Sequence, residues 1–150
     1  MNIQPFFLML VLLAAQYIFG RYPSFALILA RPIGLVALAI GIVGCALMLL
    51  GAFSLAWRKT TLHPGHRPQK LVTGGVYRYS RNPIYLGMLL ILCTIPLMAT
   101  QPRLLVFTLI YYVIMDFYVI PREEKIIQSA MGTAYQVYLS RTRRWFGTYY

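Results

Sequence analysis

Four long runs of apolar residues, separated by shorter polar segments, dominate the chain. They cover residues 3–19, 33–57, 84–99 and 104–120. A helix needs about 20 apolar residues, at about 1.5 Å per residue, to cross the hydrocarbon core of a bilayer. The second run exceeds that length, whereas the third and fourth are short and are joined by a tight link that contains Pro102. The pattern predicts an all-α integral membrane protein with four transmembrane helices, the last two forming a hairpin.

Small residues recur along the second run at steps of three and four, which places them on one face of a helix. The predicted face consists of Gly34, Ala37, Gly41, Gly44, Cys45, Met48 and Gly51. Small side chains allow the backbones of two helices to approach closely in lipid. We therefore expect this face to pack against another helix.

Composition agrees with a membrane protein. Of 150 residues, 59% are hydrophobic and only 11% are charged, although the formal net charge is +11. Disordered chains have low hydrophobicity, and soluble domains have about 25% charged residues, so both classes are excluded. A basic nucleic-acid-binding domain is excluded for the same reason. The length predicts a single domain over residues 1–150. Cys45 and Cys93 lie in apolar runs, so we expect two buried thiols and no disulfide framework.

Positive charge is distributed unequally between the polar segments. Lys and Arg number two in residues 21–32, six in 58–81, one in 101–103 and five from residue 121 onward. Basic segments remain on the cytoplasmic side of a membrane. The count predicts a cytoplasmic loop at 58–83, a cytoplasmic tail at 121–150 with short helices, and both termini on the cytoplasmic side.

The loop ends in Asn82-Pro83, which is typical of a helix N-cap followed by proline in the first turn. Tyr85 follows in the first turn of the third helix. Free N–H groups at such an end attract a carboxylate or a phosphate. Arg78 and Arg81 precede it, and contact with anionic lipid headgroups is an alternative use of this charge.

The tail begins with Glu123 and Glu124, two of only three acids in the chain. They either favour the dipole of a helix that begins at Pro121 or bind a polar ligand. We expect Gly132 to end that helix and Thr133 to cap a second one. The remaining residues of interest are expected at the membrane interface, or as a headgroup anchor: Tyr135, Tyr138, Arg141, Arg143, Arg144 and Trp145.

The third acid, Asp116, lies inside the fourth run. An intramembrane carboxylate faces the protein interior or a wet cavity, and a hydrogen bond to Tyr111 or Tyr112 is a competing structural use. His63 and His66 have no further His or Cys nearby, so no metal site is expected. The chain contains neither a dinucleotide-binding glycine fingerprint nor a P-loop.

Residues 71–87, LVTGGVYRYSRNPIYLG, resemble the signature of the isoprenylcysteine carboxyl methyltransferase family, which is related to the phospholipid N-methyltransferases. The tail resembles the family's C-terminal motif through Arg122-Glu123-Glu124, Gly132, Tyr135, Tyr138 and Arg141. The two motifs span residues 62–144. They occur in the family's order and are separated by the predicted hairpin.

The resemblance implies an integral membrane methyltransferase that uses S-adenosylmethionine, releases S-adenosylhomocysteine and has no Rossmann domain. Its acceptor would be lipophilic, either an isoprenylcysteine-like carboxylate or a phospholipid-type amine, and would enter from the bilayer. The resemblance places the cofactor against Leu71, Val72, Gly74, Tyr77, Asn82, Tyr85 and Gly87, with Glu123 and Glu124 closing the site. Glu123, Glu124 and Arg141 would be catalytic, or Arg141 would brace the tail. Many relatives carry His where this chain has Asn82, which hydrogen-bonds but cannot titrate as a base.

Two other functions are compatible with the pattern. One is a non-catalytic membrane scaffold or assembly factor. The other is a small oligomeric transporter, suggested by Asp116. Oligomeric state does not follow from the sequence.

Overall fold

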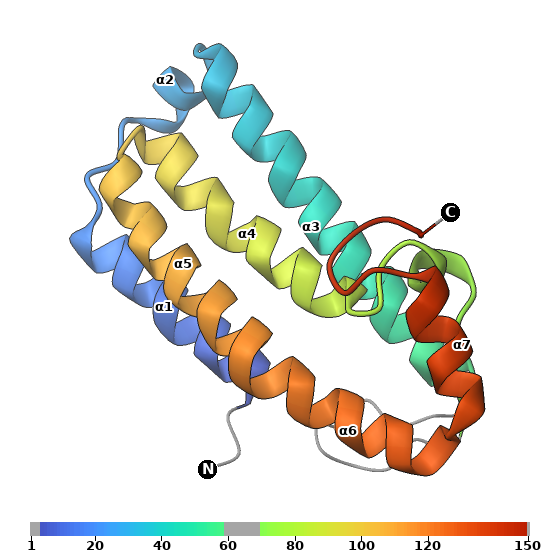
Figure 1. The fold of residues 1–150 in the computed structure, drawn as a ribbon. Helices are drawn as coiled ribbons and strands as arrows, with labels where there is room; N and C mark the ends of the chain where they lie inside the picture. Colours follow the sequence, from blue (N-terminus) through green and yellow to red (C-terminus); the bar gives the residue numbers. More distant parts are fainter. Residues whose placement is uncertain (1–3, 59–69, 150) are drawn as a thin grey trace.

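The computed structural model describes residues 4–58 and 70–149. Four long helices lie side by side (Figure 1): α1 (Pro5–Phe19), α3 (Pro32–Trp57), α4 (Pro83–Ala99) and α5 (Leu105–Ile114). Helix α4 packs against both α3 and α5, and α1 packs against α4 and α5. A short helix, α2 (Phe25–Leu29), precedes α3. The four long helices lie within the predicted apolar runs or one to two residues beyond them, whereas α2 was not predicted.

The remaining elements are short. A 3₁₀ turn, η1 (Gly75–Arg78), precedes α4, and another, η2 (Pro102–Leu104), links α4 to α5. A π turn, η3 (Met115–Val119), joins α5 to α6 (Ile120–Met131), and α7 (Thr133–Arg141) follows. Across residues 4–58 and 70–149 the structure contains no strand, only a single bridge between Thr142 and Thr148. The predicted all-α class is confirmed for this part of the chain.

Within the described residues, membrane-spanning length is clear for two helices. Pro32–Trp57 has 26 residues, and the continuous rod Pro102–Met131 has 30. Helices α1 and α4 are apolar but have 15 and 17 residues, fewer than the about 20 that a perpendicular crossing needs. Four crossings therefore remain a prediction. Residues 59–69, with His63 and His66, lie outside the described part of the chain.

The tail does not begin a separate helix at Pro121, as the sequence suggested. The helix continues through Pro121 because the backbone changes to π geometry just before it, with the Ile120 N–H donating to the Met115 carbonyl. Proline removes an N–H and crowds the carbonyl four residues earlier. Wider π turns relieve such crowding.

The predicted small-residue face packs on α4. A Cβ on Gly87 of α4 would clash with the carbonyl of Gly44 and lie 2.8 Å from the Met48 nitrogen. A Cβ on Gly51 would lie 2.7 Å from Ile84 Cγ1. Cys45 does not belong to this face, because the helix turns its side chain outward and exposes it. Cys93 is only partly buried, so the expectation of two buried thiols is wrong; both cysteines are free.

A polar contact joins α1 to the rest of the bundle. Pro96 lies inside α4 and offers no N–H to the carbonyl of Leu92. Two side chains donate to that carbonyl instead: Gln16 Nε2 of α1 at 3.1 Å and Thr108 Oγ1 of α5 at 3.0 Å. All three residues are buried, so the donors satisfy a backbone group that has no access to solvent.

Candidate functional site

The start of α4 is tied to the C-terminal tail. Asn82 occupies the N-cap position and Pro83 the first turn, as predicted, but the Asn82 side chain makes no capping bond. Its Nδ2 donates instead to the carbonyl of Arg144 at 3.2 Å, while its backbone N–H donates to Ser80 Oγ at 3.1 Å. Asn82 therefore has the predicted position but not the predicted capping hydrogen bond. Its side-chain amide donates to the tail instead.

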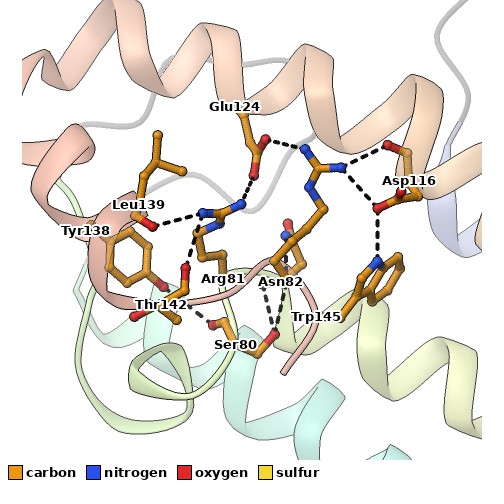
Figure 2. Close-up of polar contacts among 10 residues, drawn as sticks. Ser80, Arg81, Asn82, Asp116, Glu124, Tyr138, Leu139, Thr142 and Trp145 are labelled. Carbon is orange, nitrogen blue, oxygen red and sulfur yellow. Dashed lines mark hydrogen bonds and ion pairs between the residues drawn. The ribbon is translucent and has the colours of Figure 1, made fainter. Parts of the chain in front are cut away.

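The tail after α7 pairs with the segment just before α4, residues 77–82 (Figure 2). We call this tail, residues 142–147, the strap. Bonds from the strap include Thr142 Oγ1 to the Arg78 carbonyl (3.2 Å), the Arg81 N–H to the Arg143 carbonyl (3.1 Å) and the Gly147 N–H to the Tyr79 carbonyl (2.7 Å). Tyr138 Oη, from the end of α7, donates to the Tyr77 carbonyl at 2.6 Å. Stretches more than 55 residues apart in sequence thus form one unit.

Glu124 of α6 lies between two arginines. Arg81 Nη2 is 2.9 Å from Glu124 Oε1, and Arg144 Nη2 donates to Oε2 at 2.9 Å. The side chains of Arg81 and Glu124 are only 11% and 17% exposed. Arg81 also donates to the carbonyls of Leu139 and Thr142. Charges this shielded from water interact strongly, so Glu124 holds the loop and the strap against α6.

Asp116 is bonded by the strap as well. Arg144 Nη1 donates to its carboxylate at 3.1 Å and to its backbone carbonyl at 3.2 Å, and Trp145 Nε1 donates to the same carboxylate oxygen at 2.9 Å. The Trp145 ring packs on Tyr112 at 5.4 Å between centroids. Arg144 and Trp145 therefore bind inside the protein and are not the predicted headgroup anchor. The predicted tyrosine partners of Asp116 are also wrong, since Tyr111 donates to Met88 Sδ.

Glu123 has a different environment from its neighbour. Tyr85 Oη donates to Glu123 Oε1 at 2.8 Å, which connects the first turns of α4 with α6. Within residues 4–58 and 70–149, no lysine or arginine forms an ion pair with Glu123. The structure thus separates the two adjacent acids: Glu124 is neutralised by arginines, and Glu123 meets a neutral hydroxyl.

Burial shapes the ionisation of the groups around the strap. Desolvation raises the pKa of Tyr77 and of Tyr138, so both hydroxyls remain neutral donors. Burial opposes the charge on Arg144, but hydrogen bonds to Glu124 and Asp116 outweigh this and raise its pKa. Arg144 therefore remains a cation.

The structure gathers only part of the predicted cofactor set. Tyr85 and Glu123 meet directly, and Asn82 and Glu124 meet through Arg144. Tyr77 is buried, with its hydroxyl 3.5 Å from the Gly51 carbonyl. The others have separate positions: Val72 is buried, Leu71 and Gly74 are half-buried, Gly87 packs on α3, and Arg141 is exposed at the end of α7.

Two helix-end predictions in the tail differ in outcome. Gly132 ends α6 with a φ of 53°, a left-handed conformation that glycine adopts without strain. Thr133 does not cap α7, because Gly132 occupies the cap position and Thr133 is the first helical residue.

Sequence reasoning missed the roles of Arg81 and Arg144 at this site. A usable signal existed: the chain has three acids, and carboxylates at the end of apolar helices need cationic partners. Which of 14 basic residues would supply them depends on how the strap folds back. In the described part of the chain, no group of three or more His, Cys, Asp or Glu side chains could hold a metal ion.

The comparison with protein families identifies the chain's relatives. The family model for phospholipid methyltransferases matches residues 29–134, more than two thirds of the chain. The match runs from α2 to the start of α7, and so includes α4, the segment before it and both glutamates. Among curated proteins and among solved structures, none matches. The chain belongs to the phospholipid methyltransferase family.

Proposed function

We propose that the protein is a membrane methyltransferase that uses S-adenosylmethionine and methylates a lipophilic acceptor arriving from the bilayer. Family membership supports methyl transfer in general, and the long apolar helices support a location in the membrane. The observation that carries the proposal is the contact between Tyr85 and Glu123. Beside the start of α4 lies an acid that has no arginine partner among residues 4–58 and 70–149.

The donor set at this end of the bundle suits the proposed cofactor. When bound, S-adenosylmethionine supplies an activated methyl group on a sulfonium sulfur, and its amino-acid part carries an ammonium group. A carboxylate already paired with arginine gains little from a second cation, whereas Glu123 can pair with an ammonium. Glu123 Oε1 accepts from Tyr85, and within residues 4–58 and 70–149 Oε2 remains available. Tyr85 thereby orients the carboxylate.

The other predicted cofactor residues separate into two groups. Leu71, Val72, Gly74 and Tyr77 remain in the proposal as the wall formed by the loop before α4. Glu124 and Gly87 are proposed to support the site without contacting the cofactor. Glu124 pairs with two arginines, and Gly87 packs against α3. Arg141 lies exposed where α7 ends, and a role near the acceptor headgroup remains part of the proposal.

The chemistry of the acceptor decides whether a base is needed. A carboxylate acceptor is a nucleophile without losing a proton, whereas a protonated amine must first release one. Asp116 and Glu124 are held by Arg144, so Glu123 is the acid suited to take that proton on Oε2. Both acceptor classes therefore belong in the test.

The experiment measures cofactor binding by the protein in lipid nanodiscs. Calorimetry with S-adenosylmethionine and S-adenosylhomocysteine should give saturable binding. Glu123→Gln should weaken it about tenfold or more, because a charge-assisted contact is lost. Arg122→Gln is the matched control: it lies next in sequence, is exposed and should bind normally. Turnover is then assayed with vesicles containing amine-headgroup phospholipid and with a prenylated cysteine carboxylate.

Failure of the folded protein to bind either cofactor form would refute the proposal and favour a non-catalytic scaffold. The transporter alternative rested on Asp116. That carboxylate is bonded to Arg144 and Trp145, which accounts for it structurally.

We further propose that the protein is multi-pass, with the site and both termini on the cytoplasmic side. The asymmetric distribution of basic residues supports this topology. Reporter fusions after residue 101 and at the C-terminus should report opposite sides of the membrane. Signals from the same side would refute it.

A further inference from the structure

The π turn at Met115–Val119 determines which residue of α6 faces α4. In an α-helix each residue advances the chain by about 100° around the axis. A π turn holds one residue more than an α turn, so every residue after it is rotated by about that angle. With the π turn, Glu123 meets Tyr85. With α geometry throughout, the residue in that place would be Arg122.

The π geometry leaves one backbone carbonyl without a donor in its own helix. Ile120 donates to Met115, five residues earlier, and the next residue is proline. The carbonyl of Asp116 would pair with the N–H of residue 121, which Pro121 lacks. Arg144 Nη1 donates to this carbonyl at 3.2 Å and to the Asp116 carboxylate at 3.1 Å.

The same guanidinium reaches beyond the turn. Arg144 Nη2 binds Glu124, so one side chain connects the π turn, at Asp116, with α6 after it. Its backbone carbonyl accepts from Asn82 Nδ2 at the start of α4. Arg144 is thus bonded to the π turn, to α6 and to α4, the three elements whose relative rotation brings Glu123 to Tyr85.

We propose that Arg144 is a positioning residue for methyl transfer: it holds the π register of the α5–α6 rod and thereby keeps Glu123, not Arg122, opposite Tyr85. The assignment of a reaction to Glu123 rests on the proposed function. The register itself does not, because it follows from the hydrogen bonds of the π turn and the strap.

Cross-linking of paired cysteines reads the register directly. In a Cys45→Ala/Cys93→Ala background, one protein carries Tyr85→Cys with Glu123→Cys, and another carries Tyr85→Cys with Arg122→Cys. Side chains that meet at their tips leave the Cα atoms too far apart for a disulfide, so a short bifunctional thiol reagent is used. We expect efficient cross-linking of 85 with 123 and little of 85 with 122.

Arg144→Gln should weaken this preference, lowering the ratio of the 85–123 to the 85–122 product about fivefold or more, although Pro121 still disfavours full α geometry. Arg143→Gln is the matched control. It lies next in the strap, and its side chain packs on the Tyr149 ring at 5.2 Å without touching an acid. Arg144→Lys keeps the charge but cannot bond both carboxylates with one planar group, so it should give an intermediate ratio even if Arg144→Gln does not fold.

Equal ratios in the Arg143 and Arg144 variants would overturn the proposal. Loss of both products in Arg144→Gln would also overturn it, since α4 and α6 would then have separated instead of changing register. Kinetics in the cysteine-free background provide a second readout: Arg144→Gln should lower kcat about tenfold or more with a smaller change in KM for S-adenosylmethionine. If no variant binds the cofactor, the proposed function fails while the cross-linking still decides the register.

Discussion

Two prolines interrupt helices in this protein, and the structure repairs the two breaks differently. Because Pro96 in α4 has no N–H, the Leu92 carbonyl accepts hydrogen bonds from two neutral side chains, the Gln16 amide and the Thr108 hydroxyl. Because Pro121 in α6 has no N–H, the Asp116 carbonyl accepts a hydrogen bond from the Arg144 guanidinium, which also binds the carboxylates of Asp116 and Glu124. In both cases a donor from a distant part of the chain replaces the lost backbone bond.

The difference follows from position. The Leu92 carbonyl lies deep among apolar helices, where an unpaired charge is costly and neutral donors suffice. The Asp116 carbonyl lies near the end of the apolar run 104–120, where the strap can bring a charged side chain to it. The first repair therefore joins helices, whereas the second connects helix geometry with the acids of the candidate site.

Removing the carboxylate that Arg81 and Arg144 share should have the largest effect on stability. Glu124→Gln leaves Arg81 and Arg144 close together without their shared carboxylate, and removing one partner of a buried ion pair costs about 3–5 kcal/mol. We expect a loss of this order in the free energy of unfolding, measured in mixed micelles. Glu123→Gln removes the charge but keeps an amide oxygen that can still accept from Tyr85, so it should change the free energy of unfolding by less than about 1.5 kcal/mol. Equal losses in the two variants would contradict the division of roles between the two acids.

Separating α4 from α3 should have the next largest effect, because α4 carries Leu92 at one repair and Asn82 at the other. Gly87→Ala places a methyl group against the backbone of α3, which cannot move aside locally. Overpacking of this kind costs about 2–3 kcal/mol, which thermal unfolding would detect. Gly41→Ala is the control, since its Cβ would meet only the Thr94 side chain at 3.0 Å. A smaller loss for Gly87 than for Gly41 would contradict the packing role.

The neutral repair can be dissected with a double-mutant cycle. Gln16→Leu or Thr108→Val alone leaves the Leu92 carbonyl one donor, so each should cost about 0.6 kcal/mol, an average value for such bonds in membranes. The double variant leaves that buried carbonyl unpaired and should cost about 2 kcal/mol. Additive losses in the unfolding free energy would mean that the two donors do not share one acceptor.

Asn82 should give the smallest effect. Asn82→Ala loses the bond to the Arg144 carbonyl and should destabilise by about 1 kcal/mol. Asn82→Asp cannot donate either and directs a carboxylate oxygen at that carbonyl, so we expect it to be less stable than Asn82→Ala. A helix cap would predict the opposite order, since aspartate caps as well as asparagine. Melting temperatures without ligand distinguish the two.

The helices of the bundle and their packing face could be predicted from sequence. Apolar runs at 3–19, 33–57 and 84–99 place three helices within a residue or two of the observed ends, and glycines at steps of three and seven mark where α3 meets α4. The position of a helix and the face on which its small residues lie both depend on residues within one or two helical turns along the sequence. The two motifs also led to the family that the comparison confirms. The exposed Cys45 shows the limit, since a neighbour of Gly44 along the chain can point away from it.

The contacts of the candidate site could not be predicted in this way. That Glu123 meets Tyr85 while Glu124 meets arginines depends on the π turn, and that turn is linked to a strap more than 20 residues away. Local sequence limits which backbone groups lack partners, because proline has no N–H. Which side chain supplies the missing bond is decided by the tertiary fold, since donors from many parts of the chain compete and only the folded path brings one within about 3 Å.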